Sequence, residues 1–208
     1  MKKIKHYLAV IILCIAAFTV TETASLNYGI TTVQAKVSST TKKKAQNAYR
    51  RFLTQKKYKY FRVWDIDKDG LKELLVTDGK DKVGKYPAGA NVYTYTGGKV
   101  VYAGYIGSFH SGIAYSRITK RLYSSRGGGG SLESWYYTLT KNKKIKTVVC
   151  GAYENGVKNG KMQYTCLYNG KRITYKKWNQ IVRSWARQSL TLKYYNNTQA
   201  NRKKYIKM

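Results

Sequence analysis

The sequence has 208 residues, and its 40 lysines and arginines against nine acidic residues give a net charge of +31. This length is enough for one domain with a real hydrophobic core. So strong a charge excludes a basic partner surface and favours anionic polymers or anionic membrane surfaces as partners.

The first 35 residues have the pattern of a secretory signal peptide. Three lysines lie among the first five residues, residues 8–20 are apolar apart from Thr19, and Val33 and Ala35 are small residues of the kind a signal peptidase reads. An apolar stretch of about 13 residues is too short to cross a hydrocarbon core of about 30 Å. We therefore predict cleavage after Ala35 and a secreted, extracellular protein that can be retained at the cell wall.

The mature chain would run from Lys36 to Met208 with a net charge of +29. We divide it into a basic lead-in (36–44), a single β-rich domain (45–195) and a basic tail (196–208). Apolar residues recur at helical spacing in residues 40–55, which predicts a short helix capped by Thr40 or Thr41.

After this helix the composition changes. Tyr, Val, Thr and Ile dominate and are separated by glycine-containing turns, which is typical of strands. The predicted strands are residues 60–66, 71–77, 91–96, 99–106, 113–118, 121–125, 132–140, 144–153 and 161–168. Residues 126–131 (RGGGGS) are predicted to be a loop, because glycine loses the most backbone freedom on ordering.

Residues 92–101 and 136–145 share a weak repeat, with identical residues at Tyr93 and Tyr137 and at Thr94 and Thr138. Such spacing is near that of propeller blades, but two copies cannot close a propeller. The alternative is chance similarity between strands. We predict an open antiparallel meander sheet with propeller-blade-like hairpins.

The chain closes with a predicted amphipathic helix in residues 174–188. Trp178, Ile181, Val182 and Trp185 form one apolar stripe, and Thr174 is the expected N-cap. The helix would seal one face of the sheet, or alternatively lie on a membrane surface. The predicted fold class is α+β, mostly antiparallel β, with a short N-terminal helix and this amphipathic C-terminal helix.

Two cysteines remain in the mature chain, Cys150 and Cys166. A hairpin folded about Lys158 would place them directly opposite one another, close enough for a disulfide. An even number of cysteines in an exported chain favours the bridge, and two buried thiols are the alternative.

Six of the nine acidic residues fall between Asp65 and Asp81, in and after the segment DIDKDGLKELL. Without a cation, carboxylates this close repel one another. A hard cation such as Ca²⁺ takes six to eight oxygen ligands. The predicted ligands of a calcium site are the side chains of Asp65, Asp67, Asp69 and Glu73 and the carbonyl of Leu71.

The alternative is a metal-free turn in which Lys68, Lys72, Lys80 and Lys82 neutralise the acids. The segment is not an EF-hand, because the twelfth loop position is Val76 and the flanks read as strands. It resembles the calcium-loop β-hairpins of FG-GAP and integrin-type repeats, which carry acids at positions one, three, five and nine.

A broader resemblance covers most of the mature chain. Residues 61–74 and the Asn169–Lys171 segment resemble those of a group of small secreted proteins of Gram-positive bacteria, many from the gut, without an assigned biochemical role. The shared pattern is Phe-x-x-x-Asp-Ile-Asp-x-Asp-Gly-x-x-Glu-Leu. The resemblance implies export and one compact domain, and it supplies no catalytic residue.

These observations favour a non-catalytic, envelope-associated binding module for an anionic cell-wall polymer or acidic polysaccharide, with nucleic acid or anionic lipid as further partners. One alternative is a secreted nuclease that uses His110 with Glu133 or Glu154. Another is a cationic membrane-active protein. A zinc site is disfavoured, because one histidine and two cysteines do not make a ligand set.

Overall fold

The computed structural model describes residues 37–208 except 57, 80–81, 84–85, 108–111 and 129. The described residues all belong to one compact unit, Lys36–Met208. The predicted signal peptide and His110 lie outside the described residues, so both remain predictions. No helix in the described part is long and apolar enough to cross a membrane.

One sheet has five strands in the order β14–β1–β2–β5–β6, and every neighbouring pair is antiparallel. Its strands are β1 (Tyr60–Trp64), β2 (Glu73–Thr77), β5 (Gly89–Thr96), β6 (Lys99–Gly107) and β14 (Tyr195–Asn196).

Two helices pack on this sheet, α2 (Ser39–Gln55) and α4 (Gln199–Tyr205). Their shared core consists of Tyr49, Leu53, Phe61, Val63, Leu74, Val76 and Ile206. The Arg50 guanidinium donates to the carbonyls of Lys203 (3.1 Å) and Ile206 (3.2 Å) at the end of α4. The prediction of a separate basic tail is therefore corrected, because Ile206 is fully buried and completes the core.

The start of α2 also differs from the prediction. Ser38 is its N-cap, and the Ser38 hydroxyl accepts from the Thr41 amide at 3.1 Å. Thr40 and Thr41 lie inside the helix, which thus takes in much of the predicted lead-in.

The other large sheet has seven strands in the order β12–β11–β10–β9–β8–β7–β13, again antiparallel throughout. Its strands are β7 (Ala114–Ser116), β8 (Leu122–Gly128), β9 (Ser131–Leu139), β10 (Ile145–Lys158), β11 (Lys161–Tyr168), β12 (Lys171–Ile173) and β13 (Ser189–Thr191). A short pair, β3 (Lys82–Val83) with β4 (Tyr86–Pro87), stands apart from both sheets. The predicted glycine loop is mostly strand, since β8 continues to Gly128 and β9 begins at Ser131.

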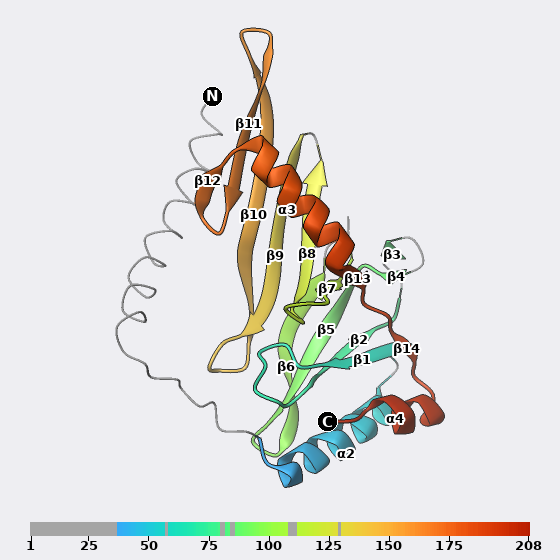
Figure 1. Cartoon of the computed structure of the whole chain (residues 1–208). Helices are drawn as coiled ribbons and strands as arrows, with labels where there is room; N and C mark the ends of the chain where they lie inside the picture. The colour runs from blue at the N-terminus through green and yellow to red at the C-terminus, as the bar shows by residue number, and fades with distance from the viewer. Residues whose placement is uncertain (1–36, 57, 80–81, 84–85, 108–111, 129) are drawn as a thin grey trace, which may run out of the picture. The chain divides into compact units, whose positions relative to one another are not determined.

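Helix α3 (Tyr175–Gln188) crosses one face of the seven-stranded sheet (Figure 1). Its N-cap is Thr174, as predicted, and the Thr174 hydroxyl accepts from the Lys177 amide at 3.2 Å. A Cβ atom at Gly151 of β10 would lie 2.9 Å from the rings of both Trp178 and Trp185. The apolar stripe of α3 therefore packs closely on the sheet.

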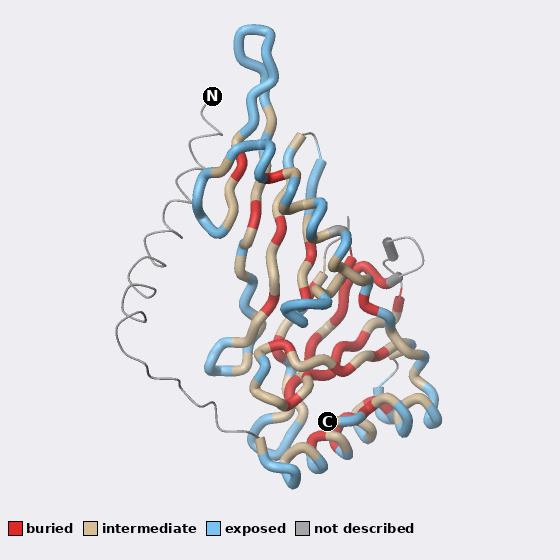
Figure 2. Tube along the Cα trace, viewed as in Figure 1, coloured by how far each residue is buried: buried red, intermediate tan, exposed pale blue. Residues whose placement is uncertain are grey.

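The two large sheets share a second core. Buried residues of both sheets and their connections form it: Ile66, Leu75, Ala90, Val92, Ala103, Ile106, Ile113, Leu122, Tyr137 and Leu192. Figure 2 shows these buried segments concentrated where the sheets meet, while the outer end of the β10–β11 hairpin is exposed.

The predicted fold class is confirmed, because 49% of the described residues are strand and the strands are antiparallel. The strands form two open sheets, however, and not one meander. The two copies of the weak repeat fall in the β5–β6 and β9–β10 hairpins, one in each large sheet.

The predicted disulfide is not formed, and Cys150 and Cys166 are both free thiols. The hairpin turns at Asn159 and Gly160, both with positive φ, so that Cys166 lies opposite Tyr153. Burial raises the pKa of the Cys150 thiol to about 11 and also raises that of Cys166. Both thiols therefore stay protonated at neutral pH.

Candidate metal site

Asp65, Asp67 and Asp69 lie in the loop that joins β1 to β2, residues 65–72. Glu73 is the first residue of β2 and pairs with Trp64, the last residue of β1. The loop turns through Lys68 (φ 63°) and Gly70 (φ 86°). Gly70 adopts this left-handed conformation at little cost, because it has no Cβ atom.

The aspartates of the loop accept hydrogen bonds from its own backbone. Asp65 Oδ2 accepts from the Gly70 amide at 3.1 Å, and Asp69 Oδ1 accepts from the Leu71 amide at 2.7 Å. Asp67 Oδ1 receives a longer contact of 3.4 Å from the Asp69 amide. Aspartate side chains favour turns for this reason.

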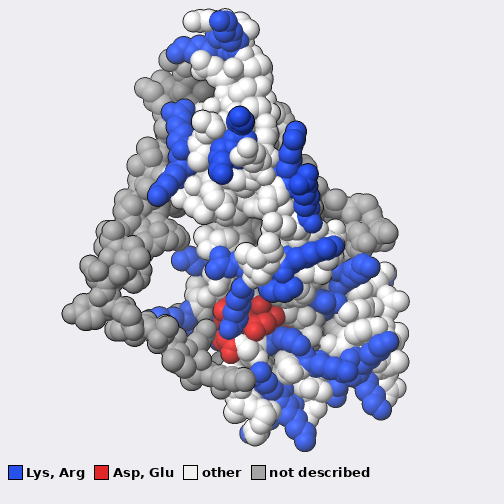
Figure 3. Space-filling model, in the orientation of Figure 1, with Lys and Arg blue, Asp and Glu red and all other residues white. Residues whose placement is uncertain are grey.

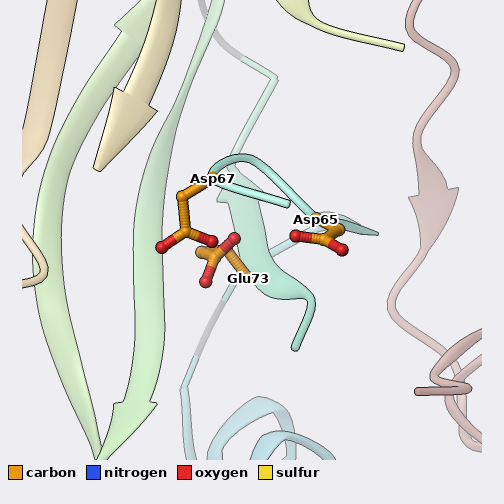
Figure 4. A group of neighbouring side chains, drawn as sticks. All are labelled: Asp65, Asp67 and Glu73. Atoms are coloured by element: carbon orange, nitrogen blue, oxygen red, sulfur yellow. The ribbon is translucent and has the colours of Figure 1, made fainter. Parts of the chain in front are cut away.

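Three carboxyl groups converge at the base of the loop. Asp65, Asp67 and Glu73 each offer one oxygen, and these oxygens lie within 4.8 Å of one another. Figure 4 shows the carboxyl groups of Asp67 and Glu73 side by side, with that of Asp65 next to them across the loop. This acidic triad could hold a metal ion.

Glu73 is the buried member of the triad, with no exposed surface. Its Oε2 atom accepts from the Ile66 amide at 2.9 Å, and its Oε1 atom accepts from the Thr94 hydroxyl at 3.3 Å. Burial, followed by the charges of Asp67 and Asp69, raises the pKa of Glu73 to about 8.

Asp65 differs from Glu73 in its partners. Its Oδ1 atom is buried and has no hydrogen-bond partner in the described part of the chain. Burial raises the pKa of Asp65, and the neighbouring charges of Asp69 and Asp67 add to this effect. A buried carboxylate oxygen without a donor is costly, and a metal ion would satisfy it.

A lysine from the other sheet reaches the same loop. The Lys143 ammonium, in the turn between β9 and β10, donates to Asp67 Oδ2 at 2.8 Å and to Asp69 Oδ2 at 2.6 Å. Burial lowers the pKa of Lys143, but the hydrogen bonds and charges of Asp67 and Asp69 outweigh this and raise it overall. Lys143 is therefore a permanent cation at this loop.

The predicted ligands separate into two groups in the structure. Asp65, Asp67 and Glu73 form the triad, whereas Asp69 divides its oxygens between the Leu71 amide and Lys143. The predicted metal role of the Leu71 carbonyl remains a prediction. Sequence reasoning missed Lys143, which no local pattern connects to a loop 76 residues earlier in the chain.

Two of the lysines named in the metal-free alternative donate hydrogen bonds to backbone carbonyls, although the charge of Asp65 also acts on Lys72 and partly offsets the lowering of the Lys72 pKa by burial. Lys68 donates to the Thr119 carbonyl, and Lys72 donates to the Lys207 carbonyl at 2.6 Å. Lys80 lies outside the described residues.

Of the residues considered for nuclease chemistry, His110 lies outside the described residues, while Glu133 on β9 lies opposite Ala152 of β10, two residues before Glu154. Glu133 pairs with Arg126 at 2.9 Å, and Glu154 is exposed on β10.

No family model, curated protein or solved structure matches this chain.

Proposed function

We propose that this protein is a secreted, non-catalytic binding module for anionic polymers of the cell envelope, with a loop stabilised by Ca²⁺. The separation of charge carries the proposal. On the face shown in Figure 3, the acidic side chains gather in one patch while lysines and arginines spread over the rest. A surface of this kind attracts polyanions and binds them with an affinity that falls as salt rises.

The loop supports the calcium part of the proposal through its ligand chemistry. Carboxylate oxygens are among the ligands that Ca²⁺ prefers, and the triad supplies them. One member of the triad, Asp65, has an Oδ1 atom without a hydrogen-bond partner in the described structure. Lys143 contacts Asp67 and Asp69 but has no hydrogen bond to Asp65 or Glu73 in the described structure. The Lys143 ammonium therefore balances only part of the negative charge at the loop.

Lys143 and a metal ion would compete for Asp67. A calcium ion bound by the triad needs an oxygen of Asp67, and the ammonium already holds Oδ2. We therefore expect modest affinity, in the range of about 10⁻⁴–10⁻³ M found for extracellular calcium modules.

A calcium titration of thermal stability tests this part of the proposal. Binding to the native state alone stabilises by about 1.4 kcal/mol at a calcium concentration ten times the Kd, which corresponds to a rise in Tm of about 4 °C for a domain of this size. Asp67→Asn should abolish most of the rise, and Lys143→Gln should shift the titration to lower calcium concentration.

Magnesium at equal concentration is the matched ion control, because the smaller ion demands octahedral geometry and releases water reluctantly. If millimolar Ca²⁺ left the Tm of both the wild type and Lys143→Gln unchanged, the loop would be an ion-paired turn and not a calcium site.

The binding part is tested by incubating the mature protein with poly(glycerol phosphate), an acidic polysaccharide and RNA. We expect retention of the polymers with an affinity that falls steeply with salt, and no cleavage of RNA. Cleavage that is lost in His110→Ala would contradict the non-catalytic proposal.

A further inference from the structure

The outward face of α3 carries cations and amides but no acid. Lys176, Gln180, Arg183 and Arg187 follow one another at spacings of four, three and four residues, so they share one side of the helix. All four are exposed. None of the acidic patch in Figure 3 lies over α3.

Part of this face is hollowed. Gln180, Arg183, Ser184, Arg187 and Gln188 line a hollow of about 330 Å³. The Gln188 side-chain amide donates to the Ser184 hydroxyl at 2.9 Å. Neither Arg183 nor Arg187 has an ion-pair partner within the described residues, so both guanidinium groups are available to an external anion.

An apolar ledge lies beside the start of α3, where the helix meets the β10–β11 hairpin. We define the ledge as Val157, Met162, Tyr164 and Tyr175, which are exposed by 69%, 49%, 38% and 39%. Val157 lies opposite Met162 in the β10–β11 hairpin, and the ring of Tyr164 stacks on that of Tyr175 at 4.0 Å.

No third strand in the part of the chain that the structure describes pairs with the outer end of this hairpin. Strand β9 reaches β10 only as far as Glu154, and strand β12 reaches β11 only as far as Cys166. The ledge is therefore a projecting surface beside the first residue of α3, and Figure 2 shows that the outer end of the β10–β11 hairpin is exposed.

The side chains of the outward face of α3 and of the ledge indicate which class of ligand can bind there. Guanidinium groups bind phosphates through paired hydrogen bonds. The carboxamides of Gln180 and Gln188 and the hydroxyl of Ser184, which line the same hollow as the arginines, suit a ligand that is rich in hydroxyls. Aromatic rings with neighbouring aliphatic side chains suit the apolar faces of sugar rings.

Other occupants fit this surface less well. A second copy of the mature chain would itself carry a net charge of +29 and would be repelled. A lipid surface would need the apolar stripe of α3, and Trp178 in that stripe is only 3% exposed.

We propose that the outward face of α3 and the ledge bind a phosphodiester polymer that carries sugar substituents. Arg183 and Arg187 hold its phosphates, and the ledge holds its sugars. The twelve residue-to-residue steps from Tyr175 to Arg187 span about 18 Å at the rise of an α-helix, so the ligand is a chain of several units. This inference rests on the proposed function and names the polymer class and the site.

The experiment uses two matched polymers, poly(glycerol phosphate) with and without glucosyl substituents. Their affinities for the mature protein are measured at fixed salt for the wild type, for Arg183→Gln/Arg187→Gln and for Lys43→Gln/Arg51→Gln. The last variant removes the same charge from exposed positions of α2. We expect the α3 variant to lose about tenfold or more in affinity for both polymers and the α2 variant less than threefold.

The ledge is tested with Tyr164→Ala and, as a milder change, Met162→Ser. Both should lower affinity for the glucosylated polymer about fivefold and leave affinity for the bare polymer unchanged. Thermal melting verifies that each variant folds, and the exposed Met162 position keeps the test open if Tyr164→Ala does not fold.

The outcomes separate this inference from the proposed function. If the wild type binds neither polymer, both the proposed function and this inference are wrong. If the α2 and α3 variants lose affinity equally, binding depends on bulk charge, and only this inference is overturned. Tighter binding of a single-stranded oligonucleotide with the same number of phosphates would overturn the assignment to a sugar-bearing polymer.

Discussion

The β1–β2 loop and the outward face of α3 use charge in opposite ways. At the loop, Asp67 and Asp69 are paired with Lys143, and Glu73 is fully buried. On α3, Arg183 and Arg187 are exposed and have no acidic partner within the described residues. Charges of the first kind govern folding stability, because burial makes an unpaired charge costly, while charges of the second kind are free to act in binding.

The largest expected effect is the pH dependence of stability in calcium-free solution. The pKa of Glu73 is about 8 in the folded protein against 4.5 for the ordinary carboxyl group. The folded state therefore keeps a proton that the unfolded state loses. The stability from this proton is complete below pH 4.5 and is lost as the pH rises through about 8, by roughly 5 kcal/mol in all.

Urea unfolding at several pH values in the presence of a chelator measures this loss. Glu73→Gln is the control, because it cannot titrate at this position and should flatten the profile. A wild-type stability that rises from pH 5 to 8 would contradict the buried, proton-retaining state of Glu73.

The next effect is that of removing the buried side chain. Glu73→Ala should lower the free energy of unfolding by about 3 kcal/mol, because it leaves the Ile66 amide and the Thr94 hydroxyl without their acceptor and opens a cavity. Glu73→Gln keeps an acceptor and most of the volume, so at pH 7 its loss should be smaller. Equal losses for the two variants would show that these hydrogen bonds contribute little.

Lys143→Gln should have an intermediate effect on the free energy of unfolding. Its ammonium links two carboxylates of the loop to the β9–β10 turn of the other sheet, and without it we expect a loss of about 1–2 kcal/mol in calcium-free solution. Calcium should restore most of this loss, which chemical denaturation with and without the ion will measure. Lys144→Gln, in the same turn, is the matched control, since Lys144 donates to the Tyr102 carbonyl and not to the acids.

The smallest effect on stability is expected on α3. Arg183→Gln/Arg187→Gln should change the free energy of unfolding by less than about 0.5 kcal/mol, because both side chains are exposed and unpaired. Thermal and urea unfolding of this variant against the wild type will test the comparison directly. If the free energy of unfolding fell by more than about 2 kcal/mol, these arginines would contribute to folding stability, as the charges at the β1–β2 loop do.

Several elements followed from local sequence. The apolar stripe and Thr174 cap of α3 were predictable, because helix periodicity and capping involve residues within four positions of one another. The β1–β2 hairpin and its acidic loop were predictable for the same reason, as the residues that build the turn are adjacent in the chain.

Other features depended on register, and there the sequence reasoning went wrong. The predicted disulfide assumed a turn centred on Lys158, whereas the chain turns at Asn159 and Gly160, a pair that is itself a hairpin signal. This shift moved Cys166 opposite Tyr153. Register errors have large consequences, because a shift of one residue changes which side chains face one another.

The sequence by itself determined the antiparallel, β-rich composition of the fold, the amphipathic α3 helix and the gathering of acids in one loop. Only the tertiary structure decided that the strands form two sheets, that residues 199–205 form a helix ending at the buried Ile206, and that Lys143 meets Asp67 and Asp69. The physical reason is distance along the chain. Periodicity, caps and turns are set by near neighbours, whereas the contact between Lys143 and Asp67 joins residues 76 positions apart and exists only after the two sheets have packed.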